Sequence, residues 1–410
     1  MILVSHPHGN ANVRSVLQVL QREGMLEKYY TTLGLSRVAA ARLPLPGKFS
    51  RQLLRRAYDL PPEKISWEPF REAIRLAALQ LRWESLIRHE TGCMSVDVVW
   101  QALDRQVAKT IRRGDEKFRG VYCYEDGALD SFRAARERGL TCFYDQPVGY
   151  FQSARRIFIE EKELVPAFAA TIPGLKDSPR KLERKARELE LADVVIAASD
   201  FVSDTLLEAG IPRGKIRVVQ FGSPDQAPPH TGYSRQGPLR LLFVGRIGQR
   251  KGISYLLDAV PRFPKADVKL SLLGEFEGPP SVFAPYAHLF EHLLPRPHQE
   301  IFEAMSRHDL FFLPSLFEGQ ALAVLEAMRC GLPAIVTPNS GAGRVVVDGR
   351  SGFVIPIRSS DAIAEKIEYF LKNRAAVEGM GLAALERARN ITWASYEGQI
   401  MSIVREGLKR

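Results

Sequence analysis

The chain has 410 residues, of which 45% are hydrophobic and 25% charged; this composition fits two folded domains and excludes a disordered chain. The formal net charge of +10 is spread over both halves, with no basic tail of the kind that binds nucleic acid, and it suits an anionic substrate or an anionic membrane surface. Four cysteines without C-x-x-C spacing predict neither a disulfide framework nor a zinc site.

The first residues predict no signal peptide, because the apolar run at residues 1–4 is short, lacks a basic leader and meets His6-Pro7 at once. No apolar stretch approaches the roughly 20 residues that a membrane-spanning helix needs. Reduced thiols are the simplest account of the cysteines. We therefore expect a cytoplasmic protein, and any membrane contact would be peripheral, at the inner face of the membrane.

Residues 2–5 predict a short buried strand, which a loop (HPHGNANVR, residues 6–14) joins to a helix with an apolar side. This order opens a doubly wound sheet, and the loop lacks the G-x-G-x-x-G pattern of dinucleotide-binding proteins. His6 and His8 are candidates for contacts with a second substrate. Two loop histidines are also compatible with ordinary hydrogen-bonded surface groups.

Residues 35–113 follow a less regular pattern, which predicts an irregular helical region. Tryptophans at 67, 83 and 100 are mixed with basic groups, and the arginines are at 51, 55, 56, 71, 75, 82 and 88. Such a mixture indicates either a surface for anionic lipid or a phosphorylated substrate, or a solvated helix face with a few core tryptophans.

Strands and helices then alternate up to residue 221, which predicts parallel βαβ units. Glu125 and Asp126 follow the predicted strand at 121–124, at the edge where open α/β sheets bind ligands. Either carboxylate could orient a substrate hydroxyl, or Asp126 could cap the next helix. The charge-rich segment 181–188 predicts an exposed helix.

Residues 223–238 have the composition of a linker, and a second alternating series follows. A strand at 239–244 leads into GRIGQRKG (residues 245–252), which is not a P-loop. Cations at 246, 250 and 251 precede a helix, where the helix dipole disfavours them. Their clustering therefore indicates a bound anion, with an exposed basic turn as the alternative.

A buried strand at 310–313 leads into PSLFEGQALAVLEAMRCG (residues 314–331). From Gln320 the pattern favours a helix that ends at Gly331, and Glu326 lies about two turns into it. Backbone N–H groups at such a helix start can hold an anion. Glu318 and Glu326 are carboxylates that suit vicinal hydroxyls, although both could also be solvated surface groups.

The spacing of these two glutamates resembles the donor-binding motif of glycosyltransferase family four, the retaining group with the GT-B fold. The resemblance extends through residues 333–336 and 348–354, and the segment at 245–252 is similar to that family's G-R-x-x-x-x-K-G. It is strongest over about residues 240–400 and poor at 35–113. It implies two doubly wound Rossmann-like α/β domains that face a central cleft, with a C-terminal helix crossing back to the first domain.

The resemblance implies the roles of the site residues. Arg246 and Lys251 would bind the donor diphosphate and, with Glu318 at the donor sugar, would form the catalytic group. Glu326 would bind the ribose. The full set of implied donor-binding residues is Gly9, Asn10, Gly245, Arg246, Lys251, Glu318, Gly319, Gln320, Ala321 and Glu326.

The expected domains are an acceptor-binding domain at 1–222, the linker at 223–238, a nucleotide-sugar domain at 239–388 and a closing helical segment at 389–410. The expected activity is transfer of a sugar from a UDP- or GDP-sugar to a glycan or a lipid-linked acceptor. A nucleotide-sugar hydrolase or epimerase of the same fold, or a non-catalytic binding protein, is the alternative. Since the chain has no Asp-x-Asp, we expect neither a metal nor another cofactor.

Overall fold

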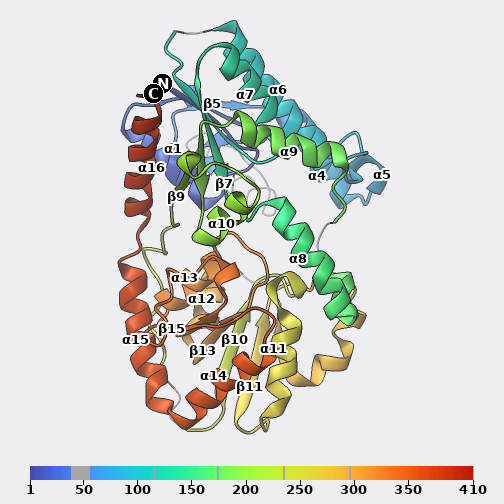
Figure 1. Cartoon of the computed structure of the whole chain (residues 1–410), viewed down its shortest axis with the longest axis vertical. Coiled ribbons are helices and arrows are strands. Elements are labelled where there is room, and N and C mark those ends of the chain that lie inside the picture. The colour runs from blue at the N-terminus through green and yellow to red at the C-terminus, as the bar shows by residue number, and fades with distance from the viewer. Residues whose placement is uncertain (38–55, 115, 173–174, 234–235, 295–296, 410) are drawn as a thin grey trace.

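The computed structural model describes residues 1–37, 56–114, 116–172, 175–233, 236–294 and 297–409. It contains two parallel sheets, one in each half of the chain, flanked by helices (Figure 1). The predicted α/β class and its two doubly wound domains are therefore confirmed. Arg51 and Arg55, predicted to contribute to a basic surface, lie outside the described residues.

The first sheet has seven strands in the order β5-β2-β1-β6-β7-β8-β9. Their bounds are β5 Ile65–Trp67, β2 Leu26–Thr31, β1 Ile2–Ser5, β6 Gly120–Tyr124, β7 Thr141–Gln146, β8 Val194–Ala197 and β9 Ile216–Val218. A separate short pair, β3 Leu35–Ser36 and β4 Ala57–Tyr58, lies beside it. The inner strands β1, β6 and β8 are buried along their whole length, as strands covered on both faces must be.

The helices of this half connect the parallel strands. They are α1 Ala11–Arg22, α4 Pro69–Gln80, α5 Glu84–Ile87, α6 Val96–Arg113, α7 Leu129–Glu137, α8 Phe151–Leu164, α9 Pro179–Leu191 and α10 Asp200–Glu208. Ser199 caps α10 as its position before the helix predicts, because its side chain accepts the N–H of Val202.

The second sheet has six strands in the order β12-β11-β10-β13-β14-β15. Their bounds are β12 Phe290–Leu293, β11 Val268–Leu273, β10 Leu239–Val244, β13 Leu310–Leu313, β14 Ala334–Val336 and β15 Gly352–Val354. The helices are α11 Ile253–Ala259, α12 His298–Ser306, α13 Leu322–Arg329, α14 Ser360–Lys372, α15 Arg374–Arg389 and α16 Trp393–Gly407.

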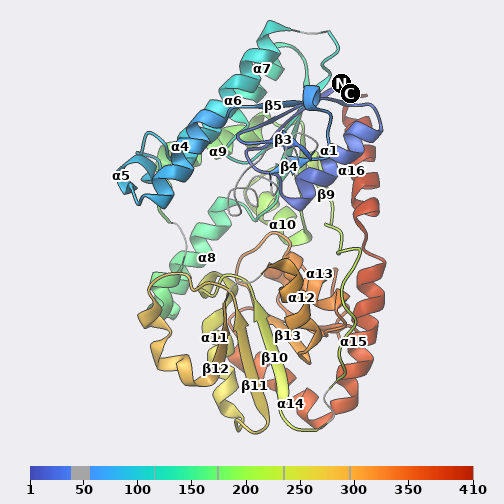
Figure 2. The same cartoon turned by 180° about the vertical axis from the view of Figure 1, so that it is seen from behind.

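The C-terminal helix α16 returns to the first domain, where it packs against α1 (Figures 1 and 2). Tyr396, Ile400 and Val404 of α16 belong to the core of the first domain. The chain passes between domains twice at one place, because Ser223 pairs with Thr392 and its N–H donates to the carbonyl of Ile391. The predicted crossing helix is confirmed.

The helix α8 extends away from the first sheet and lies against the second domain (Figure 1). Its residues Ile157 and Phe158, and Phe168 of the following 3-10 helix η2 (Pro166–Thr171), are part of the core of the second domain. A segment from the first half of the chain thus helps to build the second domain.

Candidate active site

The loop after β13 brings Glu318 to the basic turn that follows β10. Its Oε1 lies 2.6 Å from Nζ of Lys251 and 2.7 Å from Nη1 of Arg250. All three side chains are largely buried. Residues that are far apart in the sequence therefore form one compact charged group at the carboxyl edge of the second sheet, where open α/β sheets bind ligands.

The backbone of the basic turn fits tightly against the loop after β13. The carbonyl of Arg250 accepts the N–H of Leu316 at 2.9 Å. Gly252, at φ +69°, lies so close to Pro314 that a Cβ atom would be 2.1 Å from the Pro314 carbonyl oxygen. Only glycine fits this combination of left-handed backbone and close approach, and it turns Lys251 toward Glu318.

The electrostatics keep Glu318 ionised. Burial by itself raises the pKa of this carboxyl group, but the adjacent Lys251 and Arg250 lower it below its usual range. The group carries two cations for one carboxylate and retains a net positive charge. It can therefore attract an anion while Glu318 presents an acceptor for hydroxyl groups.

The helix α13 starts at Leu322, two residues later than predicted, so Glu326 lies only one turn into it. Its Oε1 pairs with Nε2 of His298 at 2.8 Å. This hydrogen bond raises the pKa of His298, which increases the share of the charged imidazolium. Glu326 is largely buried and stands on the same loop-and-helix segment as Glu318.

The segment from Gly319 to Ala321 contacts the first domain. Gly319 bridges to Val148, and its carbonyl accepts the Ser199 hydroxyl at 2.6 Å. A Cβ atom on Gly319 would lie 1.6 Å from the carbonyl oxygen of Pro147. The Gln320 side chain accepts the N–H of Phe221 at 2.6 Å. The N–H of Ala321 donates to Ser340 within the second domain. The contacts of Gly319 and Gln320 therefore join the two domains at this point.

Arg246 does not join the charged group. Its side chain is 67% exposed, and its nearest ion-pair partner is Glu277 at 3.9 Å. Gly245, at φ +135°, lies beside the Lys251 side chain, so the turn backbone is close to the site while the Arg246 side chain is not. Arg250 lies with Lys251 beside Glu318, whereas the resemblance named Arg246 and Lys251 as the cations that bind the donor diphosphate.

On the first domain, the loop after β1 supplies Gly9 and Asn10. Gly9 packs on Tyr58 so closely that a Cβ atom would lie 2.5 Å from the ring. Asn10 is exposed and precedes α1, at whose N-terminus the helix leaves N–H groups without intrahelical partners.

His6 is buried, and its Nδ1 accepts the N–H of His8 at 2.9 Å. Burial lowers the pKa of His6 to about 3 and also lowers the pKa of His8. Neither histidine is an exposed surface group of ordinary pKa. His6 holds the shape of this loop, and the charges near His8 are those of Glu72, Arg56 and Arg75.

Glu125 and Asp126 follow β6 and face the helix α9. Nζ of Lys185 lies 3.6 Å from Oε2 of Glu125 and 3.6 Å from Oδ2 of Asp126. Asp126 adopts φ +67° and does not cap α7, so the capping alternative is wrong. Glu188 accepts the N–H groups of Ala128 and Leu129 instead. Its carboxylate reaches the start of α7 from α9, and Asp104 of α6 accepts the next two N–H groups.

The prediction of an exposed helix at 181–188 is also wrong. Lys185 and Glu188 of α9 are buried, and Arg184 pairs with the buried Asp104 of α6. Burial raises the pKa of Glu188 to about 8. A run of alternating charges in sequence is typical of a solvated helix face. The buried partners of these side chains come from distant parts of the chain, so the run itself does not predict them.

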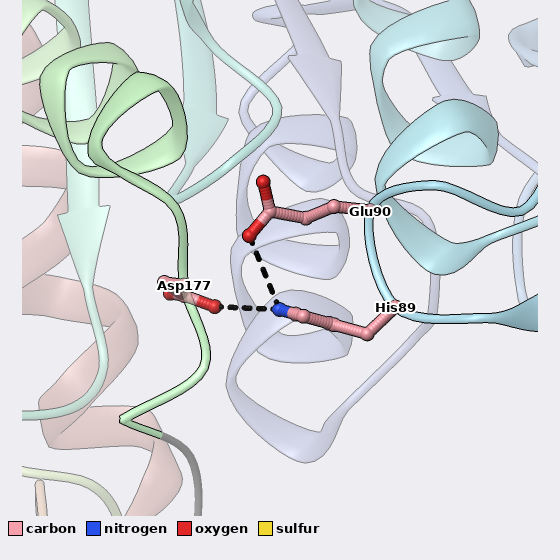
Figure 3. A group of neighbouring side chains, drawn as sticks. All are labelled: His89, Glu90 and Asp177. Carbon is pink, nitrogen blue, oxygen red and sulfur yellow. Dashed lines mark hydrogen bonds and ion pairs between the residues drawn. The ribbon is translucent and has the colours of Figure 1, made fainter.

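Figure 3 shows a second cluster, in which Nε2 of His89 lies 3.2 Å from Glu90 and 3.0 Å from Asp177. Within the described residues it is the one group of acidic, histidine or cysteine side chains spaced for a metal. Lys181 lies 3.3 Å from Asp177 and 2.8 Å from Asp97, and Glu90 accepts the N–H of Ser178. Ammonium and hydrogen-bond partners therefore account for these carboxylates, and the cluster joins α9 to the loop before α6.

Comparison with known protein families gives a match to the sequence of the second domain. Residues 232–387 match the family model of "Glycosyl transferases group 1". The second domain has the sequence pattern of a group 1 glycosyltransferase. This match includes the basic turn, Glu318 and Glu326.

The chain is 30% identical over 176 residues to "D-inositol 3-phosphate glycosyltransferase" of Corynebacterium diphtheriae; the match covers 40% of this chain and 41% of that protein. It is 30% identical over 223 residues to "Phosphatidyl-myo-inositol mannosyltransferase" of Mycobacterium leprae, covering 51% of this chain and 58% of that protein. These matches span about half the length of the relatives.

Among solved structures, Anabaena HepE, crystallised in complex with UDP, superposes with a TM-score of 0.63 and 15% identity over 99% of both chains. This likeness shows a shared fold, the two-domain GT-B fold predicted above. Within the described residues, no helix is both long enough and apolar enough to cross a bilayer.

Proposed function

We propose that the protein is a retaining, metal-independent glycosyltransferase that moves a sugar from a nucleotide sugar to a glycan or a lipid-linked acceptor. The observation that carries this proposal is the charged group of Glu318, Lys251 and Arg250 at the entrance to α13. A carboxylate held between two cations, in the loop that leads into a helix, suits a ligand that has both hydroxyl groups and phosphates.

Each residue has a distinct task in the proposed reaction. Lys251 and Arg250 neutralise the charge that develops on the departing diphosphate, with help from the N–H groups at the start of α13. Glu318 orients the donor sugar through its hydroxyls. Glu326 accepts the ribose hydroxyls beside its hydrogen bond to His298. Retention of configuration rests on the resemblance to family four.

The comparisons support a nucleotide-sugar donor. The family match covers the segment that carries these residues, and a protein of the same fold binds UDP. The acceptor would bind at the first domain, where the loop after β1 and the Glu125–Asp126 turn lie at the carboxyl edge of the first sheet. Glu125 and Asp126 both lie 3.6 Å from Nζ of Lys185, which helps to hold this turn in position.

The test is a screen of the purified protein with UDP-, GDP- and ADP-sugars. A matching ligand at 100 times its Kd should stabilise the fold by about 2.7 kcal/mol, visible as a rise in Tm. Turnover with a glycan or lipid acceptor and a product of retained anomeric configuration would support the full proposal. Release of free sugar with no acceptor dependence would indicate a hydrolase, and binding without turnover a binding protein.

The proposed peripheral membrane contact rests on exposed side chains of one segment of the first domain, residues 67–88. Among the described residues, five of the twelve exposed large apolar side chains lie between positions 67 and 83, on and beside α4 and α5. Phe70 is 67% exposed and Trp83 53%. Arg82 and Arg88 of the same segment are also exposed, so the segment offers apolar side chains for insertion together with positive charge. Arg75, in contrast, is largely buried on Glu72.

Liposome co-sedimentation tests this contact. The protein should sediment with vesicles containing phosphatidylglycerol and not with pure phosphatidylcholine, and binding should weaken as salt rises. Phe70→Ser with Trp83→Ser should abolish sedimentation. The matched control is Leu382→Ser, which removes a comparably exposed apolar side chain on α15. Equal recovery with neutral and anionic vesicles would show that these side chains do not recognise anionic lipid.

A further inference from the structure

A buried carboxylate on α8 reaches the basic turn from the first half of the chain. Oε1 of Glu161 accepts a hydrogen bond from Nε2 of Gln249 at 2.6 Å and another from the Tyr255 hydroxyl at 2.8 Å. Its Oε2 accepts from Nε of Arg358 at 2.8 Å. The Glu161 side chain is fully buried, and its two oxygens have donors from three segments of the second domain.

These contacts fix the start of the basic turn. Gln249 is fully buried, and its side chain also bonds to both the hydroxyl and the N–H of Ser254, at 2.6 and 3.1 Å. Its own N–H donates to the hydroxyl of Thr171 in η2 at 3.0 Å. The segment from α8 to η2 thus binds Gln249 through both its side chain and its backbone.

The next two residues are Arg250 and Lys251, which hold Glu318. The backbone of a short 3-10 turn (Gln249–Lys251) offers little freedom between Gln249 and the two cations. A shift of Gln249 would therefore move both cations relative to Glu318. Glu161 contacts Gln249, and Gln249 precedes the two cations that contact Glu318. Because the Glu161 side chain is fully buried, it cannot itself contact a ligand bound at Glu318.

We propose that Glu161 is a positioning residue, which sets the place of Arg250 and Lys251 through Gln249 and so controls the affinity for the diphosphate of the donor. This inference rests on the proposed function and deepens it. It assigns a role in donor binding to a helix from the half of the chain expected to bind the acceptor. Burying a carboxylate costs desolvation free energy even when several donors converge on it. The positioning of Arg250 and Lys251 would account for a buried carboxylate at this place.

The experiment compares Glu161→Gln with Glu160→Gln. Gln keeps the shape of the side chain but has one oxygen instead of two and no charge. Its amide must face either Arg358 or the pair Gln249 and Tyr255, and the donors on that side lose their acceptor. Glu160 is the adjacent residue, is half exposed and pairs only at the outer side of Arg358, at 2.9 Å. UDP, GDP and ADP are titrated against each protein by calorimetry. Glu161→Gln should bind the recognised diphosphate at least about tenfold more weakly, and Glu160→Gln should match wild type.

Tyr255→Phe separates positioning from general stability. It removes a hydrogen bond to the same carboxylate but leaves the link to Gln249. It should lower the Tm and leave the diphosphate affinity unchanged. Gln249→Ala cuts the proposed link from the other side and should weaken diphosphate binding as Glu161→Gln does, with the double variant no weaker than either single one. If Glu161→Gln does not fold, Gln249→Ala tests the same link by itself.

Two results would overturn the inference alone: wild-type affinity in Glu161→Gln or Gln249→Ala, or an equal loss of affinity in Tyr255→Phe. A wild-type protein that binds none of the three diphosphates would instead overturn the proposed function, and this inference with it.

Discussion

Lys251 and Glu318 form an ion pair of 2.6 Å that joins the turn after β10 to the loop after β13. Neighbouring parallel strands bring the two residues together, because β10 and β13 lie side by side in the second sheet and both chains turn at its carboxyl edge. The pair is largely buried, so its strength depends little on salt. The proposed reaction would use both of its members, which makes the pair the first target for substitution.

Glu318→Gln should lower kcat at least tenfold, which is about 1.4 kcal/mol of transition-state stabilisation. The amide keeps the size of the side chain but not the charge that Lys251 and Arg250 pair with. Steady-state kinetics with the donor found by screening decide this. Glu303→Gln, an exposed change on α12, is the control and should leave kcat unchanged. A Glu318 variant as fast as that control would remove this residue from the proposed mechanism.

Glu326→Gln should act on binding more than on kcat. If the carboxylate holds the ribose, its loss weakens the affinity for the donor and for the free nucleoside diphosphate alike. The His298 contact shows that the carboxylate is accessible to a hydrogen-bond donor, the exposed imidazole at the start of α12. Calorimetric titration with the diphosphate measures the effect. Unchanged affinity would show that Glu326 does not bind the ribose and serves only to hold α12 through His298.

The buried strands could be predicted from sequence because parallel strands covered on both faces are continuous apolar runs. The bounds predicted for β10 and β13 agree with those observed. The resemblance to family four assigned Glu318 and Lys251 to one donor site, and the structure pairs them. The resemblance did not point to Arg250, because the left-handed Gly252 and the 3-10 turn decide which cations face Glu318.

The partners of α8 and α9 could not be predicted from local pattern. Lys185 meets carboxylates from the turn after β6, and Glu161 meets donors from the second domain. In sequence, both residues stand in runs of charge that favour a solvated face. A buried polar network is set by distant parts of the chain, so periodicity carries no signal for it.

Asp145 should make the stability of the fold depend on pH. It is buried in β7, where the Tyr122 hydroxyl donates to it at 2.7 Å, and burial raises its pKa to about 7. Since the folded pKa lies above the unfolded one, the folded state binds the extra proton. This contribution is fully present below the unfolded pKa and is lost as pH rises through about 7, with a slope of at most about 1.4 kcal/mol per pH unit.

Asp145→Asn should therefore flatten the fall in Tm between pH 5 and pH 8, because the amide accepts the same hydroxyl and does not ionise. The exposed Asp361→Asn should keep the wild-type slope. Parallel Tm profiles for wild type and Asp145→Asn would show that this carboxyl group does not titrate in that range.

The last prediction concerns the diphosphate. A departing nucleoside diphosphate develops negative charge, and many sugar transferases neutralise it with a divalent ion held by Asp-x-Asp, a motif that this chain lacks. Lys251 and Arg250 stand beside Glu318 instead, next to the start of α13, and fixed cations do not have to be bound first. Activity should therefore survive excess EDTA.

Lys251→Ala should abolish that activity even with magnesium or manganese supplied, because the loss removes a cation from the diphosphate and a partner from Glu318 at once. Lys265→Ala, an exposed lysine before β11, should have no effect. Turnover is measured with and without EDTA for all three proteins. If EDTA stopped wild-type turnover and manganese restored it, a metal rather than Lys251 would neutralise the leaving group, and the proposed diphosphate site would be wrong.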